Sequence, residues 1–405
     1  MASNDRGSVS KRPINGLVCL CHLRWSFVWQ RPQHLMTRLA RHTDVIVVEE
    51  PELAANREPA SLRRRSSDGI TILTPMLPGH DGTHGFTPTS NVMIAALLDS
   101  YLSSAGWTAP GRRNAAWYYT PMALGALPAD VPIALTVYDA MDELANFRGA
   151  PGELRVLEQT LIGQSDLVFT GGPSLYASRR DRHPAVHCFP SGVETSHFAA
   201  ARSVDRSPED VASLPRPVLG FYGVIDERLD VELLAAVADL RPDWSILLIG
   251  PVVKIDPATL PVRDNIVHLG MRGYAELPAY LSTFDVAILP FAINEATRFI
   301  SPTKTLEYLA AGRPVVSTPI ADVVDLYGEV VAIADGPVAF AGAVEALLDE
   351  SALARASREE RADDVVRHHE WDSIVDRMWS AMVADPLGPV PETKARRALV
   401  AALAD

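Results

Sequence analysis

Short apolar runs alternate with helical patterns along the first half of the chain. The runs are rich in β-branched and aromatic residues, which is typical of strands buried in a sheet. The segments between them include a helical pattern at 31–42, with Pro32 near its first turn. The predicted strands are 16–23, 44–50, 69–75, 115–120, 133–139, 166–171 and 186–190, and a further helix is predicted at 91–104.

The periodic pattern stops after Phe198 and begins again near residue 217. Residues 200–217 are rich in Ala, Ser, Pro and charged side chains, which indicates a linker, assigned to 201–216. Beyond it the predicted strands are 217–223, 244–250, 265–270, 285–291, 314–319 and 330–334, and the predicted helices are 230–240, 303–312, 338–350 and two more up to about residue 382.

This alternation predicts an α/β protein with two domains of similar size. Strands that alternate with helices imply right-handed crossovers, which place the strands in parallel sheets covered by helices on both faces. The prediction divides the chain into a disordered N-terminus at 1–13, an N-terminal domain at 14–200, the linker, a C-terminal domain at 217–385 and a tail at 386–405.

The charge distribution argues against a nucleic-acid partner. The net charge is -13, but residues 1–200 hold 18 basic and 18 acidic side chains, which leaves 19 basic and 32 acidic ones for residues 201–405. Affinity for DNA or RNA comes mainly from Lys and Arg, so no nucleic-acid binding is expected. The polar N-terminus lacks a signal-peptide core, and no run reaches the ~20 apolar residues that span a bilayer, so a cytoplasmic protein is expected.

The chain lacks the usual sequence motifs of several enzyme classes. The chain has no Gly-x-Gly, no Gly-Lys pair and no Gly-x-Ser-x-Gly, which disfavours dinucleotide-dependent oxidoreductases, P-loop NTPases and serine hydrolases. Neither His-Glu-x-x-His nor Asp-x-Asp occurs, so chemistry without a metal is expected. Cys19 and Cys21 alternate along the first apolar run, which favours one buried strand face over a metal site.

The segment 291–320 combines a strand end with a helix start that suits an anion. Ser301 and a proline open the predicted helix, and the free amides of residues 303–305 and the ammonium group of Lys304 could meet a diphosphate. Glu307 could accept hydrogen bonds from ribose hydroxyls. The alternative is that Lys304 and Glu307 only form an ion pair across one helical turn.

The stretch SPTKTLEYLAAGRPVVSTPI at 301–320 resembles the donor-nucleotide segment of glycosyltransferases with the two-domain GT-B fold. PSGVETSHF at 190–198 resembles the segment that closes the first domain of these enzymes. LRWSFVWQRPQHLMTRLA at 23–40 is similar to the opening of bacterial family 4-like (group 1) transferases of the teichuronic-acid and exopolysaccharide type. The resemblance covers about residues 16–382, nearly the whole chain.

The resemblance implies two Rossmann-like α/β/α domains that face each other across a cleft. It places a nucleotide-diphosphate-sugar donor, such as a UDP-sugar, in the C-terminal domain and the acceptor on the N-terminal domain. The donor is a co-substrate, and no cofactor is expected besides it. The expected donor-binding residues are Gly223, Arg228, Gly250, Met271, Asn294, Glu295, Ser301, Thr303, Lys304 and Glu307.

The chain departs from the family pattern at two places. Many family 4 members carry two glutamates eight positions apart, and Glu307 occupies the second position, but Phe299 occupies the first, so Asn294 or Glu295 would have to substitute. The family pattern also places a pair of basic residues after the first strand of the C-terminal domain, and this chain has only Arg228 there. Its forked guanidinium suits a diphosphate, and an exposed arginine at a helix start is the alternative.

The loop after the first strand holds aromatic and hydrogen-bonding side chains that suit a sugar. Asp139 and Asp142, at the end of the fifth predicted strand, are the expected catalytic carboxylates. An inverting transfer needs one of them as a base, whereas in a retaining transfer, the course of most family 4 relatives, the leaving diphosphate could do that work. The expected acceptor-binding residues are Trp25, Trp29, Gln30, Arg31, His34 and Tyr119, and the alternative for either tryptophan is to fill the core.

These observations predict a metal-independent, retaining glycosyltransferase with a carbohydrate, lipid-linked or small-molecule acceptor. The alternatives are a sugar-nucleotide epimerase on the same two domains and a two-lobed sugar-binding protein. A loop with Arg57 and residues 63–65, with Arg112 and Arg113 near it, could dock the N-terminal domain on anionic headgroups, which would give a peripheral contact on the inner membrane face. A solvated arginine-rich loop is the alternative.

Overall fold

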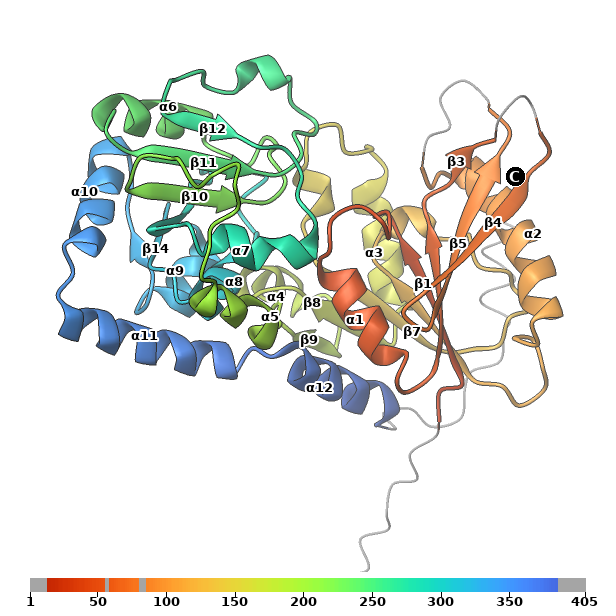
Figure 1. The fold of residues 1–405 in the computed structure, drawn as a ribbon. Coiled ribbons are helices and arrows are strands. Elements are labelled where there is room, and N and C mark those ends of the chain that lie inside the picture. The colour runs from red at the N-terminus through yellow and green to blue at the C-terminus, as the bar shows by residue number, and fades with distance from the viewer. Residues whose placement is uncertain (1–12, 55–57, 80–84, 385–405) are drawn as a thin grey trace, which may run out of the picture.

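The computed structural model describes residues 13–54, 58–79 and 85–384, in which the strands form two separate sheets (Figure 1). One sheet is built from residues 16–188 and the other from residues 218–333. The predicted disordered N-terminus, apart from residue 13, and the predicted tail lie outside the described residues.

The N-terminal sheet contains nine strands within the described ranges, and they lie in the order β3-β5-β2-β1-β6-β7-β8-β9, with β4 on β5. The β4–β5 pair is antiparallel and the other pairs are parallel. The bounds are β1 (Gly16–Cys21), β2 (Asp44–Glu49), β3 (Glu52–Leu53), β4 (Ser61–Ser67), β5 (Ile70–Leu77), β6 (Asn114–Tyr118), β7 (Ile133–Ala140), β8 (Leu167–Thr170) and β9 (Val186–Cys188).

The C-terminal sheet is parallel throughout, with the order β12-β11-β10-β13-β14-β15. The order reverses direction between β10 and β13, and ligands of such open sheets bind beyond the carboxyl ends of the strands at this point. The bounds are β10 (Val218–Tyr222), β11 (Ser245–Ile249), β12 (Ile266–His268), β13 (Val286–Leu289), β14 (Val315–Ser317) and β15 (Ala332–Ile333).

Helices cover both sheets. In the N-terminal half they are α1 (Arg31–Leu39), α2 (Pro88–Ser104), α3 (Leu154–Gln164), α4 (Pro173–Arg179) and α5 (Thr195–Ala199). In the C-terminal half they are α6 (Val231–Leu240), α7 (Leu277–Leu281), α8 (Lys304–Ala310), α9 (Ala321–Tyr327), α10 (Pro337–Leu348), α11 (Ala352–Arg367) and α12 (Trp371–Val383).

Every predicted strand is present within two or three residues at each end, and the predicted parallel α/β architecture is confirmed. Two strands were not predicted, the short β3 and the longer β4. The prediction of a loop at residues 63–65 is wrong, because all three lie in β4. This edge strand is polar and largely exposed, so it lacks the apolar pattern that marks the other strands.

The first strand shows why the strands of the parallel sheet appear in the sequence as continuous apolar runs. Leu17 and Cys19 pack in the core on one face of the sheet, and Val18 and Leu20 pack in the core on the other face. Both cysteines of this strand are buried and free, as the strand interpretation of the sequence predicted. A sheet covered on both faces needs apolar residues at every position of its strands.

The last helix belongs to the core of the other domain. Figure 1 shows α11 and α12 running along one side of the molecule from the C-terminal to the N-terminal half. Trp371, Ile374 and Met378 of α12 pack in the N-terminal core, and α12 contacts α1. The range 217–385 placed this helix in the C-terminal domain; the packing assigns it to the N-terminal one.

The segment predicted as a linker packs on the C-terminal domain. Val211 is buried in the C-terminal core. Arg202 donates hydrogen bonds to the carbonyl oxygens of Leu309 and Ala310 at the end of α8 and pairs with Asp363 of α11. The segment that connects the two domains therefore lies against the C-terminal domain.

Candidate active site

A cavity of about 500 Å³ lies between the two domains, beyond the carboxyl ends of their central strands. Its C-terminal wall follows β10, β11 and β12 and includes the start of α8, and its N-terminal wall follows β1 and includes the end of β4. The principal lining residues are Trp25, Phe27, Val28, Trp29, Arg65, Ser66, Ser67, Tyr222, Gly223, Gly250, Met271, Arg272, Tyr274, Lys304 and Glu307.

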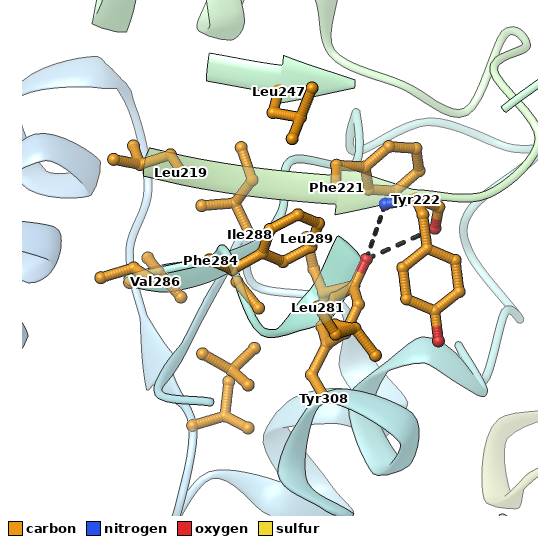
Figure 2. Packing of buried hydrophobic residues seen from close by; sticks show 14 of the residues in the cluster. Leu219, Phe221, Tyr222, Leu247, Leu281, Phe284, Val286, Ile288, Leu289 and Tyr308 are labelled. Atoms are coloured by element: carbon orange, nitrogen blue, oxygen red, sulfur yellow. Dashed lines mark hydrogen bonds between the residues drawn. The ribbon is translucent and has the colours of Figure 1, made fainter. Parts of the chain in front are cut away.

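The end of β10 is fixed to α8 through two tyrosines (Figure 2). The hydroxyl of Tyr308 accepts a hydrogen bond from the Tyr222 backbone amide at 3.0 Å and donates to the Tyr222 carbonyl oxygen at 3.3 Å. The Tyr308 ring is fully buried and packs against Phe284 and Tyr222. This contact sets the position of α8 relative to the strand that ends at the cavity.

Lys304 and Glu307 form an ion pair and also line the cavity. The Lys304 Nζ lies 3.2 Å from Glu307 Oε2 and 5.1 Å from the centre of the Tyr222 ring. The Tyr222 hydroxyl donates a hydrogen bond to Glu307. The side chains of Lys304 and Glu307 are 16% and 7% exposed, so both are partly desolvated. The two interpretations of this pair are thus compatible, because the paired groups are the ones that face the cavity.

Gly223 and Gly250 let two strand ends approach each other. Both have positive φ angles, 149° and 148°, which favour glycine. A Cβ atom on Gly250 would lie 1.7 Å from the Gly223 carbonyl oxygen. A Cβ on Gly223 would lie 3.6 Å from the Lys304 side chain. Glycine at these positions leaves no side chain between the two strand ends and the cavity that they line, and their expected part in donor binding stays a prediction.

The other residues predicted near the start of α8 have different surroundings. The backbone amide of Thr305 donates to the Pro302 carbonyl oxygen at 3.2 Å, so the expectation of a free amide at residue 305 is wrong. Thr303 is the first residue before α8, and its hydroxyl lies 3.5 Å from Lys304 Nζ. Ser301 packs against Gly172 of the N-terminal domain, outside the cavity lining.

Arg228 and Asp142 also lie outside the cavity lining, where the two domains meet. The guanidinium of Arg228 is held by both carboxylate oxygens of Asp226, with Nη2–Oδ2 at 2.7 Å, and lies 5.4 Å from the ring centre of Phe147 in the N-terminal domain. Burial raises the pKa of Asp142 to about 6, against the opposing effect of the positive charge on Arg228. The structure therefore brings these two predicted residues close together.

Asn294 and Glu295 stabilise their own loop and a domain contact. The Asn294 side chain accepts from the Thr297 amide and donates to the Glu227 carbonyl oxygen. The Glu295 carboxylate lies 3.7 Å from Arg298, and its backbone carbonyl accepts from Asn146 of the N-terminal domain. Neither side chain lines the cavity.

The aromatic loop after β1 does reach the cavity. Trp25 and Trp29 line it, with ring centres 6.2 Å apart, and Trp29 also packs on Tyr274 of the C-terminal domain at 5.9 Å. The buried carboxylate of Glu49, at the end of β2, accepts a hydrogen bond from the Trp25 amide at 2.6 Å and so anchors the loop. The prediction that this loop provides the acceptor wall stays a prediction with favourable geometry.

Arg31 and Asp139 form a buried ion pair outside the cavity lining. Arg31 Nε and Nη2 each lie 2.9 Å from an Asp139 carboxylate oxygen, and Nη1 donates to the Phe189 carbonyl oxygen at 2.8 Å. The two side chains are 2% and 0% exposed. Their hydrogen-bonding groups are thus used within the protein, joining α1, β7 and the end of β9.

The remaining predicted acceptor residues lie behind the cavity wall. His34 is buried, accepts a hydrogen bond from Trp29 Nε1 and stacks on Trp371 of α12, and burial lowers its pKa well below its ordinary value. Gln30 precedes α1, where its backbone amide donates to the Gln33 side chain. Tyr119 is buried and lies outside the lining.

Several residues that line the cavity were not predicted as site residues, among them Tyr222, Arg272, Tyr274, Phe27 and Arg65. Tyr222 ends a predicted strand, and Arg272 and Tyr274 follow another, so their position at strand ends could have identified them. Phe27 lies within the aromatic loop that was singled out. Arg65 gave no such signal, because the strand that carries it was not recognised.

The arginines of β4 do not form one exposed basic patch. Arg63 pairs with Glu52 and Arg65 pairs with Glu49, while Arg64 lies 6.0 Å from the ring centre of Tyr101 in α2. Residue 57 lies outside the described residues. Across the part of the chain that the structure describes, no helix has both the length and the apolar character needed to cross a membrane, and no group of three or more His, Cys, Asp or Glu side chains could hold a metal ion.

Comparison with known proteins agrees with the resemblance seen in the sequence. Residues 216–350 match the family described as glycosyl transferases group 1, and this segment contains Gly223, Gly250, Lys304 and Glu307. The chain is 25% identical over 308 residues to the putative teichuronic acid biosynthesis glycosyltransferase TuaH of Bacillus subtilis strain 168, a match that covers 69% of this chain and 74% of that protein.

Solved structures share the fold over almost the whole chain. Sucrose-phosphate synthase from Thermosynechococcus elongatus superposes with a TM-score of 0.65 at 16% identity, covering 96% of this chain and all of that one. The structure described as "Trehalose-6-phosphate from E. coli bound with UDP-2-fluoro glucose" superposes with a TM-score of 0.67 at 13% identity, covering 93% of this chain and all of that one. The chain is a glycosyltransferase with the GT-B fold, and its residues 216–350 match the domain described as glycosyl transferases group 1.

Proposed function

We propose that this enzyme moves a sugar from a nucleotide-diphosphate-sugar donor to a carbohydrate acceptor inside the cavity between its domains. The observation that carries this proposal is the pairing of Lys304 and Glu307 at the cavity wall, within the segment that matches the group 1 glycosyltransferases. The match to a structure bound with UDP-2-fluoro glucose supports a donor of this class.

In this proposal the C-terminal wall binds the donor. The Lys304 ammonium contacts the diphosphate, and the backbone at Gly223 and Gly250 allows the phosphates to come close. Glu307 accepts hydrogen bonds from the ribose hydroxyls in place of the one it accepts from Tyr222. A positive charge that is already in place and partly desolvated stabilises the negative charge that develops on the leaving diphosphate.

The proposed transfer retains the configuration of the anomeric carbon. The bond between that carbon and the diphosphate oxygen breaks, the acceptor oxygen bonds to the carbon, and the departing diphosphate accepts the acceptor's proton. Asp142 lies outside the cavity lining, so we assign it a longer-range electrostatic role, in which its ionised form stabilises the positive charge that develops on the sugar. Asp139 has no such role in the proposal, because Arg31 already uses both of its oxygens.

The acceptor lies on the N-terminal wall, where Phe27 and Trp29 offer apolar rings to a sugar, while Trp25 is 7% exposed and packs in the core behind them. The similarity to TuaH supports an acceptor that belongs to a growing polysaccharide. The chain has no Asp-x-Asp motif, and we propose that Lys304 supplies the charge that a divalent ion provides in other transferases.

The test is an assay for released nucleoside diphosphate. Purified protein is incubated with a panel of nucleotide-sugars in excess EDTA, and both the nucleotide and the sugar products are identified. The proposal predicts release of nucleoside diphosphate from at least one donor, with the sugar's configuration retained. An epimerised nucleotide-sugar with no release would support the epimerase instead, and activity that requires added magnesium or manganese would contradict the metal-free mechanism.

A further inference from the structure

One arginine of β4 lines the cavity, although the two arginines before it do not. Arg65, Ser66 and Ser67 line the N-terminal wall. Arg64 instead lies against Tyr101 of α2, and Arg63 is paired with Glu52. Strand alternation turns Arg64 to the opposite face of β4 from Arg63 and Arg65, and of these three arginines only Arg65 lines the cavity.

The position of Arg65 is set by a buried carboxylate. Its Nη2 donates to Glu49 Oε1 at 2.9 Å, and Glu49 is fully buried. The same carboxylate accepts hydrogen bonds from the Trp25 amide and from the Thr74 hydroxyl, both at 2.6 Å. Glu49 therefore holds Arg65 and the aromatic loop in a fixed relation on the same wall.

Three arginines lie around this carboxylate and that of Glu52. Arg24, Arg63 and Arg65 share the two carboxylates of Glu49 and Glu52 in the ion pairs formed by the described residues. Within the described part of the chain, Glu49 accepts from one terminal nitrogen of the Arg65 guanidinium, while the Nε is buried and has no hydrogen-bond partner. A guanidinium has five N–H donors, and the Arg65 side chain is 36% exposed, so donors remain for a ligand.

Among the described residues that line the N-terminal wall, Arg65 is the one cation, and it adjoins apolar surface. Trp25, Phe27, Val28 and Trp29 form the adjoining part of the wall. Such a wall suits a ring that carries an anionic substituent, because the ring packs on the aromatic side chains while the substituent meets the guanidinium.

We propose that Arg65 is a specificity-determining residue that binds an anionic group, a phosphate or a carboxylate, on the acceptor. The inference rests on the proposed function in one respect, namely that the N-terminal wall is the acceptor side. Arg65 belongs to the N-terminal sheet, whereas Lys304, the cation assigned to the donor, belongs to the C-terminal domain. The acceptor would accordingly be an acidic sugar or a sugar phosphate and not a neutral sugar.

The test compares three ring compounds by calorimetric titration: phenyl β-glucuronide, phenyl phosphate and phenyl β-glucoside. Each is titrated into the full chain with and without saturating UDP, which occupies the proposed diphosphate site at Lys304. The variants are Arg65→Gln, Arg65→Lys and the control Arg64→Gln, which changes an arginine of the same strand that faces away from the cavity. Thermal unfolding of each variant shows whether it has kept the fold, and Arg65→Lys keeps the positive charge beside Glu49.

The wild type and Arg64→Gln should bind at least one anionic compound about tenfold more tightly than the glucoside, the range of a charge-assisted hydrogen bond. Arg65→Gln should remove this preference without changing UDP affinity, and Arg65→Lys should keep part of it. The glucuronide and the phosphate separate a carboxylate from a phosphate acceptor. Equal affinities for all three compounds in the wild type, or an unchanged preference in a folded Arg65→Gln, would overturn the proposal. Failure of UDP to bind would count against the donor site alone, because the titrations without UDP still test Arg65.

Discussion

Lys304 is one of four lysines in a chain that contains 33 arginines, and it lies at the cavity wall between Tyr222 and Glu307. Replacing it with alanine should weaken the binding of nucleoside diphosphate by about 1.5 to 3 kcal/mol, because one charge-assisted hydrogen bond to a phosphate is lost. Calorimetric titration measures this directly. Arg298→Ala is a matched control, since Arg298 is an exposed cation of the preceding loop that does not line the cavity. Equal affinities for the two variants would remove Lys304 from the donor site.

The pair of Arg31 and Asp139 leads to a prediction about stability. Asp139→Asn leaves the buried Arg31 without its counter-charge, which should lower the free energy of unfolding by about 3 to 5 kcal/mol. Denaturant unfolding is the measurement, and Asp372→Asn, which removes an exposed partner of Arg38 and Arg41, should change stability little. A variant that keeps its stability but loses activity would restore Asp139 to the catalytic role expected from the sequence.

Asp142 should make activity depend on pH near 6. Its pKa is raised to about 6, so its ionised form, which the proposal requires, predominates above that pH and is lost below it. The turnover rate should fall as the pH drops through 6, and Asp142→Asn should lower the rate and remove this dependence. A pH profile of the variant that still falls near pH 6 would assign the titration to another group.

The same raised pKa has an opposite consequence for stability. Since the folded-state pKa lies above the ordinary value of 3.8, the proton binds more tightly in the folded protein, and this contribution to stability is lost as the pH rises through 6. Asp142→Asn should therefore be more stable than the wild type at pH 7 to 8, and this advantage should disappear near pH 4.

At the residue scale the sequence identified Lys304, Glu307, Gly223, Gly250 and both loop tryptophans as site residues, and all line the cavity. Each follows a strand end or starts a helix, so its place along the chain determines where it lies in the fold. The sequence could not show that the partner of Asp139 would be Arg31, 108 positions away, because that pairing depends on how α1 packs on β7.

At the scale of elements, apolar runs predicted strands well because both sheets are buried on both faces. The polar strand β4 escaped prediction, since an exposed edge strand has no apolar face to reveal it. The sequence also did not predict which domain α12 packs against. Its amphipathic pattern shows that one face of the helix is buried, but the pattern does not identify the domain that covers this face.

Trp371 of α12 provides a test of this domain crossing. It is buried in the N-terminal core and stacks on His34 with ring centres 4.9 Å apart. Trp371→Ala should destabilise the protein by about 3 to 5 kcal/mol, the usual cost of removing a large buried side chain. Leu353→Ala, which shortens an exposed side chain on α11, should have little effect. Hydrogen exchange should show lost protection in α1 and β1, and protection lost only in the C-terminal sheet would contradict the assignment of α12.

At the scale of the whole molecule, the two domains meet through residues from many separate loops. Phe147 of the N-terminal domain lies between cations of the C-terminal one, with Lys254 Nζ at 4.7 Å and Arg228 Cζ at 5.4 Å from its ring centre. The Asp322 carboxylate in turn accepts from the Ser174 amide of the N-terminal domain. Contacts of this kind join residues far apart in sequence, which is why the sequence predicted two domains but not the cavity that forms between them.

The central claim is that the cavity between the domains binds the donor through its C-terminal wall. An experimental structure of the protein with bound nucleoside diphosphate tests this claim most directly. The account predicts the diphosphate beside Lys304 and the backbone of Gly223 and Gly250, with the ribose hydroxyls at Glu307. A nucleotide bound elsewhere, or a diphosphate that makes no contact with Lys304 while the Lys304–Glu307 pair stays intact, would contradict it.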